Sequence, residues 1–388
     1  MPEVSSRSLA MPESGIRRIF ELALERPGTT MLAVGEPFAT PPIEATRAAI
    51  DAWERGDVRY TANGGIAPLR GAIAEKLARE NGMTVGLDQI VVTAGGTQAL
   101  SHAMLLTLAE GDEILVPDPG YTVFSMAPRM IGAVPVRYRL EPERGFAPDA
   151  AVIRSLITPR TRAIVVNSPS NPLGVAFDRA TLQAIVDLAV ENDLWIISDE
   201  VYERFTYGVP HVSIATLPGA AERTLTVHSV SKTYALTGGR LGWLVTPPGL
   251  AGIMAKIQEA TTSCVNTPVQ WAGYGALTGS QESVKRAADL YRDRLAVSTR
   301  ILDERGIPYL PPTGAFYLWV DVSHASGGDV AAWCERFLVT EGVAVAPGSA
   351  FGPAGEGWIR ICAASDEADL VRGLEALPVP VEVAARAS

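Results

Sequence analysis

From about residue 88 onward, the chain alternates between short apolar runs and longer amphipathic segments. Two of the runs, 164–166 and 195–197, are apolar throughout, as expected for central strands that helices cover on both faces. In the segment 178–191, Asp178 can cap a helix whose apolar residues recur at helical spacing. Strands that alternate with helices predict an α/β fold built on a mostly parallel sheet. The strand-like runs are Ile90–Thr93, Glu113–Pro117, Val134–Tyr138, Arg162–Asn167, Leu194–Ser198, Thr224–His228 and Leu241–Val245.

The two ends of the chain depart from this alternation. An amphipathic helix over 14–25, capped by Ser14, precedes a short strand over 31–34 and a helix over 43–55. Helical stretches over 249–262 and 281–305 lead into a strand, helix, strand, strand, helix pattern, which is typical of a compact α+β unit. A chain of 388 residues exceeds the size of a single hydrophobic core. We therefore predict an N-terminal arm, 1–38, that packs with the small domain, a large domain, 39–284, and a small C-terminal domain, 285–388.

Composition restricts the possible partners. Hydrophobic residues make up 47% of the chain and charged residues 20%, which is ordinary for a soluble globular protein. The formal net charge of −10 disfavours nucleic acid or an anionic membrane as the main partner. Three widely spaced cysteines, with no apolar leader and no apolar run of membrane-spanning length, favour a cytoplasmic location.

Hydroxyl and cationic side chains gather in the stretch 228–242. The hydroxyls of Ser229 and Ser231, together with the guanidinium of Arg240, are suited to bind a phosphate group. Lys232 lies between them and could form a Schiff base with a phosphorylated aldehyde held there. A solvated surface loop is the simpler alternative, so the interpretation depends on the rest of the chain.

Two further polar clusters follow other predicted strands. Gly95, Gly96 and Thr97 open a helix, where free amides and a hydroxyl can bind phosphate. Asn171 lies in a proline-rich loop and can donate a hydrogen bond to a ring oxygen. A Gly-Gly turn without a ligand and an ordinary turn rich in Asn, Pro and Ser remain the alternatives.

The run 194–198 is followed by two groups that suit a pyridine ring. Asp199, at the end of an apolar strand, would keep a pyridine nitrogen protonated, and Tyr202 could hydrogen-bond a phenolic oxygen. Asp199 could instead cap the next helix. Ligands of open α/β sheets bind beyond the carboxyl ends of the strands. We therefore expect all four clusters to meet in one site for a phosphorylated pyridine aldehyde.

Several motifs in this chain resemble those of one enzyme family. They are Gly35-Glu36-Pro37, Tyr60, Asn171-Pro172, Asp199 with Tyr202, Ser229-x-Ser231-Lys232 with Arg240, Gly314-Ala315-Phe316-Tyr317 and Ile359-Arg360. The chain resembles the class I/II aminotransferases, the fold type I enzymes that use pyridoxal 5′-phosphate, and in particular their bacterial aspartate aminotransferase-like subgroup. The resemblance implies a large domain with a mostly parallel seven-stranded sheet, a smaller α+β domain and an obligate homodimer.

The resemblance also implies roles for single residues. Lys232 would form the Schiff base and then move the substrate proton, while Asp199 would pair with the pyridinium; with Tyr202 they are the predicted catalytic residues. Arg360 would clamp the substrate α-carboxylate, with Gly35 and Asn171 beside it. The other predicted cofactor ligands are Gly95, Gly96, Thr97, Tyr121, Asn171, Tyr202, Ser229, Ser231, Arg240 and, contributed from one subunit to the site of the other, Tyr60.

The implied reaction moves an amino group between an L-amino acid and a 2-oxo acid in ping-pong order. Aspartate with 2-oxoglutarate is the favoured pair, while aromatic and aliphatic donors stay open because no second arginine can be assigned to a distal carboxylate. The alternatives are a β-lyase, synthase or decarboxylase on the same fold and, more remotely, a regulator without enzymatic activity. The four histidines are scattered without metal-ligand spacing, so we expect no metal site.

Overall fold

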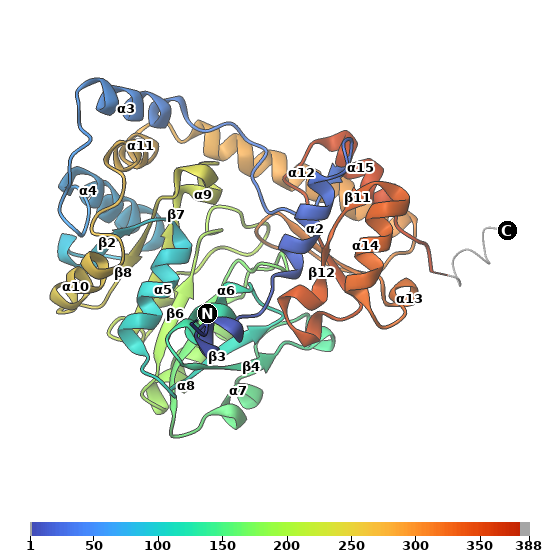
Figure 1. Ribbon diagram of the computed structural model, residues 1–388, viewed down its shortest axis with the longest axis horizontal. Helices are drawn as coiled ribbons and strands as arrows, with labels where there is room; N and C mark the ends of the chain where they lie inside the picture. Colours follow the sequence, from blue (N-terminus) through green and yellow to red (C-terminus); the bar gives the residue numbers. More distant parts are fainter. Residues whose placement is uncertain (1, 381–388) are drawn as a thin grey trace.

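The seven predicted strands form one sheet. The structure, a computed structural model, describes residues 2–380, and this sheet occupies the left and lower centre of Figure 1. Its strand order is β2-β8-β7-β6-β5-β3-β4, and β8 runs antiparallel to both of its neighbours while the other pairs are parallel. The predicted mostly parallel sheet is therefore confirmed. The strands are β2 (Ile90–Thr93), β3 (Glu113–Asp118), β4 (Val134–Arg139), β5 (Thr161–Asn167), β6 (Trp195–Asp199), β7 (Thr224–Ser229) and β8 (Gly242–Val245).

Helices cover both faces of this sheet. Val165 and Ile197 pack with α5, α6 and α10 on one face, whereas their chain neighbours Ile164 and Ile196 pack with α7 and α8 on the other. Successive strand residues point to opposite faces, so burial on both sides explains the uninterrupted apolar runs. The helix over 178–191 begins as predicted, because the Asp178 side chain caps it. These helices are α5 (Gly96–Thr107), α6 (Val123–Met130), α7 (Ala150–Leu156), α8 (Arg179–Glu191) and α10 (Ala251–Thr261).

Three more helices cover the edge of the sheet formed by β2 and β8. Helices α3 and α11 pack closely, since a Cβ added to Gly275 would lie only 2.4 Å from the backbone oxygen of Glu44. Most residues of α11 are buried, so it lacks the one-sided apolar stripe by which helices are recognised. That is why α11 was absent from the sequence prediction. The helices are α3 (Ile43–Glu54), α4 (Ala67–Lys76) and α11 (Thr267–Thr278).

The C-terminal part of the chain forms a second, antiparallel sheet with the strand order β12-β13-β10-β9. The strand predicted over 343–346 is divided in two: β11 pairs in parallel with β1 of the N-terminal arm, while β12 joins the second sheet. The arm is thus hydrogen-bonded to the C-terminal part of the chain. The predicted boundary between 284 and 285 falls in the first turn of α12, and the division into domains stays a prediction. The elements are α2 (Gly15–Leu24), β1 (Thr30–Met31), α12 (Glu282–Glu304), β9 (Tyr309–Leu310), β10 (Tyr317–Asp321), α14 (Val330–Glu341), β11 (Val343–Ala344), β12 (Ala346–Pro347), β13 (Trp358–Cys362) and α15 (Glu367–Glu375).

Two observations bear on the cellular setting. No helix between residues 2 and 380 is long and apolar enough to cross a membrane. Cys264, Cys334 and Cys362 are all free thiols. The cytoplasmic location stays a prediction.

Candidate active site

A cavity of about 300 Å³ opens at the carboxyl ends of β5, β6 and β7. The last residues of these strands, Asn167, Asp199 and Ser229, all line it. Among the predicted site residues, Gly95 and Tyr60 lie outside the lining. The four sequence clusters therefore meet as expected. The predicted residues that line the cavity are Gly35, Gly96, Thr97, Tyr121, Asn171, Asp199, Tyr202, Ser229, Ser231, Lys232, Arg240 and Arg360.

Lys232 lies in the short helix α9 (Val230–Thr233), directly after β7. Its Nζ donates a 2.7 Å hydrogen bond to the carbonyl oxygen of Gly35. Burial lowers the pKa of Lys232 from 10.5 to about 8, and the charges of Arg360 and Arg240 contribute to the lowering. Burial, more than the neighbouring cations, is therefore the cause of the low pKa of Lys232. An amine that loses its proton near neutral pH can act as a nucleophile.

The carboxylate of Asp199 is buried at the end of β6. The pKa of Asp199 is raised to about 7, mainly because burial penalises the charged form and partly because of the adjacent charge of Glu200. The hydrogen bond that Asp199 accepts from the Val201 amide is long, at 3.4 Å. The residues after Asp199 form a turn rather than a helix, so the alternative role as a helix cap does not apply. A buried carboxylate with so weak a partner is suited to bind a protonated ligand nitrogen.

Arg360, on β13, is held on several sides, with only 2% of its surface exposed. Its Nη1 donates to Asn171 Oδ1 at 2.8 Å and its Nη2 donates to the carbonyl oxygen of Ala33. The rings of Tyr317 and Phe351 lie 4.6 and 5.0 Å from its Cζ. Because Oδ1 of Asn171 accepts the hydrogen bond from Arg360, the side-chain nitrogen of Asn171 is the atom left to bind a ligand. A guanidinium fixed in this way is suited to bind a carboxylate.

Hydroxyls and a guanidinium gather at another part of the cavity. Ser229 caps α9, since its Oγ accepts a 3.0 Å hydrogen bond from the Ser231 amide, and the two Oγ atoms lie 2.8 Å apart. Arg240 has a left-handed backbone and donates to the carbonyl oxygen of Thr237 at 2.8 Å. Gly95 lies against this guanidinium, because an added Cβ would lie 2.5 Å from Nη2 of Arg240. With the first amides of α5, these groups form a site suited to an anion.

Tyr202 pairs with Tyr317, which the sequence analysis included in a motif without assigning it a role. Its Oη lies 2.7 Å from Oη of Tyr317, on β10. Burial raises the pKa of Tyr202 well above its usual value, so the phenol keeps its proton. The two tyrosines are 115 positions apart, and no local pattern could have linked them. The other lining residues that the prediction missed are Ile16, Val34, Leu100, Asn167, Val201 and Thr237.

Tyr60 is placed on the surface, with 90% of its area exposed. Trp53 and Val58 nearby in the chain are also more than half exposed. A side chain in this position does not reach the cavity of its own chain. Its assignment to the site of a second subunit stays a prediction.

Known proteins are similar to this chain in sequence and in architecture. The family described as aminotransferase class I and II matches residues 28–377. The aspartate/prephenate aminotransferase of Thermus thermophilus is 38% identical over 384 residues, which cover 97% of this chain and 98% of that protein. Aromatic-amino-acid aminotransferase 2 of Thermococcus litoralis is 36% identical over 362 residues, which cover 92% of this chain and 93% of that protein.

A solved structure extends the similarity to the fold. Aspartate aminotransferase from Thermus thermophilus with maleate has a TM-score of 0.91 and 38% identity, covering 97% of this chain and 99% of that one. The fold type I architecture implied by the resemblance is thereby confirmed. The chain belongs to the class I and II aminotransferase family, whose members are pyridoxal phosphate-dependent enzymes.

Proposed function

We propose that this aminotransferase holds pyridoxal 5′-phosphate in the cavity and moves the amino group of L-aspartate to 2-oxoglutarate in a ping-pong reaction. The observation that carries the proposal is the meeting of the Lys232 amine, the buried Asp199 carboxylate and the fixed Arg360 guanidinium in one cavity. The name of the Thermus thermophilus relative supports aspartate as the donor. The name of the Thermococcus litoralis relative makes aromatic amino acids the second candidate class.

The residues around the cavity fit this cofactor. Asp199 has only a long hydrogen bond from the Val201 amide, so its carboxylate is ready to pair with a protonated ring nitrogen. The amide nitrogen of Asn171 and the phenol of Tyr202 would bind the ring oxygen, and Tyr121 would stack on the ring. The phosphate would be held by the hydroxyls of Thr97, Ser229 and Ser231, by the Gly95–Gly96 turn and by Arg240.

The bound cofactor supplies an electron sink that makes the Cα proton of an attached amino acid acidic. Lys232 would remove that proton and deliver it to C4′ of the cofactor. A pKa of about 8 leaves part of the lysine unprotonated at neutral pH, as this role requires. Asp199 would keep the ring nitrogen protonated. Arg360 would bind the substrate carboxylate through its two Nη atoms and so orient the Cα–H bond toward Lys232.

A panel of amino donors tests the proposed reaction. Purified protein loaded with pyridoxal phosphate is mixed with single L-amino acids, and the visible absorbance band and the formation of glutamate from 2-oxoglutarate are followed. We expect aspartate to bleach the band and 2-oxoglutarate to restore it. Release of ammonia and pyruvate without any need for 2-oxoglutarate would instead identify a β-lyase.

Replacing Gly95 with alanine should weaken cofactor binding. The backbone φ of Gly95 is +81°, which strains an alanine, and the new Cβ would displace the guanidinium of Arg240. Loss of one hydrogen bond from Arg240 to the phosphate, about 1.5–3 kcal/mol, corresponds to a rise of roughly 10- to 150-fold in the Kd for pyridoxal phosphate, measured by fluorescence titration. Gly71→Ala is the matched control, because a Cβ at Gly71 meets no atom within 4 Å. Equal Kd values for the two variants would refute the phosphate site.

We also propose that the enzyme is a homodimer in which Tyr60 of one subunit reaches the phosphate site of the other. Its 90% exposure supports a role outside its own chain. Tyr60→Phe should raise the cofactor Kd roughly 10- to 100-fold, the loss expected for one hydrogen bond to a charged group. Sedimentation should show a dimer for the native protein and for Tyr60→Phe. The control is Tyr309→Phe, because the Tyr309 hydroxyl donates a hydrogen bond to Asp303 at the surface. A monomer with unchanged cofactor affinity would contradict the proposal.

A further inference from the structure

A buried network of charged side chains lies behind the ends of β6 and β7. Asp199 and Ser229, the last residues of these strands, line the cavity. Glu200 and His228 are their neighbours in the chain, and each is only 1% exposed. Because successive residues of an extended segment point to opposite faces, these two side chains point away from the cavity.

Glu203 forms one half of the network. It accepts hydrogen bonds from Nζ of Lys76 and, at 2.6 Å, from Nδ2 of Asn81, while Nδ1 of His228 lies 3.4 Å from its Oε2. Lys76, itself only 2% exposed, also donates to Oδ1 of Asn81 at 2.7 Å. Asn81 ends a π-helical turn, Leu77–Asn81, that continues α4. Such turns are rare and often occur at functional positions.

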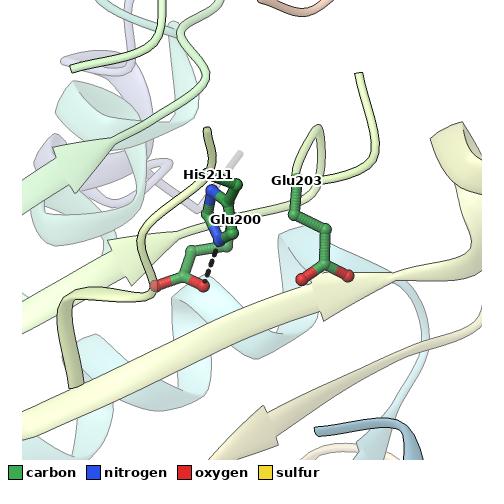
Figure 2. A group of neighbouring side chains, drawn as sticks. All are labelled: Glu200, Glu203 and His211. Atoms are coloured by element: carbon green, nitrogen blue, oxygen red, sulfur yellow. Dashed lines mark hydrogen bonds and ion pairs between the residues drawn. The ribbon is translucent and has the colours of Figure 1, made fainter. Parts of the chain in front are cut away.

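Glu200 forms the other half. Its Oε1 accepts hydrogen bonds from the hydroxyls of Ser198 and Ser213, at 2.9 and 3.1 Å, and from the amide of Ile214 at 3.2 Å. Its Oε2 lies 3.0 Å from Nε2 of His211. Figure 2 shows the ring of His211 against the carboxylate of Glu200, with the carboxylate of Glu203 beside them.

The three side chains drawn in Figure 2 have ligand atoms within 4.8 Å of one another, a spacing that could hold a metal ion. The ammonium of Lys76 already supplies a cation to Glu203. Glu200 already receives hydrogen bonds from two hydroxyls, an amide and a histidine. The charges are therefore satisfied by protein groups, and we assign no metal to this cluster.

Stability alone does not explain such a network. A buried ion pair is often no more stabilising than apolar residues of the same volume, because both charges lose their hydration. The network instead encloses the turn from Glu200 to Glu203, which carries Tyr202 and directly follows Asp199. Lys76 joins this turn to α4, and His228 joins it to β7, the strand that leads to Lys232.

We propose that Lys76, Glu200, Glu203, His211 and His228 position the cofactor-binding residues: they fix the turn that carries Asp199 and Tyr202, and the balance of charge between Glu200 and His211 sets the proton affinity of Asp199. The inference rests on the proposed function only in taking Asp199 as the partner of the cofactor ring.

The sign of each charge effect follows from the neighbours. Asp199 faces the charge of Glu200, which raises its pKa, and that of Lys232, which lowers it; the phenols of Tyr121 and Tyr202 are also close. Burial opposes protonation of His211, but Glu200 and Glu203 outweigh burial and Lys76, so the pKa of His211 is raised. A proton on His211 is therefore stabilised by Glu200 and offsets the charge of that carboxylate when it is bound. Removing His211 leaves the charge of Glu200 uncompensated. Removing Glu200 takes away the negative charge next to Asp199 and also the partner that stabilises the His211 proton, so part of its effect is cancelled.

Two variants with opposite expected shifts test the proposal. The carboxyl group of Asp199 is titrated by NMR in the full-length protein with isotope-labelled aspartate, and Asp199→Asn identifies the signal. Glu200→Gln should lower the midpoint by up to about one pH unit, because the negative charge next to Asp199 is lost, while the loss of the His211 proton that Glu200 stabilised offsets part of the shift. His211→Gln should raise it, because the three remaining donors keep the Glu200 carboxylate charged and its charge is then uncompensated. Glu191→Gln, which breaks the exposed ion pair with Arg154, should leave the midpoint unchanged.

Shifts in the same direction, or no shift in either variant, would overturn the proposal, since a purely structural network would alter thermal stability alone. His211→Lys keeps a cation at this loop position and should return the midpoint toward the native value. If Glu200→Gln does not fold, identical midpoints for His211→Gln and His211→Lys would equally overturn the proposal. The titration needs neither substrate nor cofactor. The midpoints can therefore shift as expected even if the protein does not perform the proposed aminotransfer, and the aminotransfer can be observed even if the midpoints do not shift.

Discussion

Replacing Lys232 with alanine should abolish both the visible absorbance of the cofactor-loaded protein and its aminotransferase activity. Among residues 2–380, Lys232 is the only lysine that lines the cavity, and burial lowers its pKa to about 8. It is therefore suited both to bond the cofactor and to move the substrate proton. Loss of the proton-transferring group alone typically costs 10²–10⁴-fold. We expect kcat to fall by about 10⁴-fold or more in an assay of glutamate formation.

The control for this variant is Lys256→Ala, since Lys256 lies exposed on α10, outside the cavity. It should keep the absorbance band and full activity. Sedimentation and circular dichroism should show that Lys232→Ala is folded, because within the described part of the chain the amine makes a single hydrogen bond, to the carbonyl oxygen of Gly35. An unchanged spectrum and rate in Lys232→Ala would show that Lys232 is not the residue that bonds the cofactor.

Replacing Arg360 with alanine should mainly weaken the use of amino acids. The guanidinium is buried and fixed by Asn171, Ala33 and two aromatic rings, so its orientation toward a carboxylate is set before the substrate binds. Breaking a buried charge pair costs about 2–5 kcal/mol, which corresponds to roughly 30- to several-thousand-fold in kcat/KM for the donor. The Kd for pyridoxal phosphate should change far less, because the partners of Arg360 are Asn171 and Ala33 rather than the residues assigned to the phosphate.

A comparison of substrates separates this role from general damage to the cavity. The native enzyme should strongly prefer an amino acid to the corresponding amine without a carboxylate, and Arg360→Ala should lose most of that preference. Arg154→Ala, which removes an exposed arginine of a surface ion pair, should keep the preference. A variant of Arg360 that still discriminates between the two substrates would show that the carboxylate binds elsewhere.

The large sheet could be predicted from the sequence because its strands are covered on both faces. Ile164 and Val165 pack on opposite sides of the sheet, and the resulting apolar run is visible along the chain. Burial on most sides also explains why α11 was not predicted, since its residues show no one-sided apolar pattern. The division of 343–346 into two short strands could not be predicted either, since it depends on pairing with Thr30 and Met31 more than 300 positions away.

The site could be predicted as far as it is built from strand ends. Asn171, Asp199 and Ser229 each follow an apolar run that points to their position. The contacts between distant segments were not visible, such as those of Arg360 with Asn171 and of Tyr202 with Tyr317. The histidines are scattered along the chain, yet the fold brings His211 and His228 to the glutamates beside Asp199.

The central claim, a covalent bond between Lys232 and pyridoxal phosphate, can be tested by chemical trapping. The loaded protein is reduced with borohydride, digested and analysed by mass spectrometry. The chain has four lysines, at positions 76, 232, 256 and 285, so the modified peptide identifies the residue without ambiguity. We predict one pyridoxyl group per chain, on Lys232. A group on any other lysine, or no bound group at all, would contradict the account.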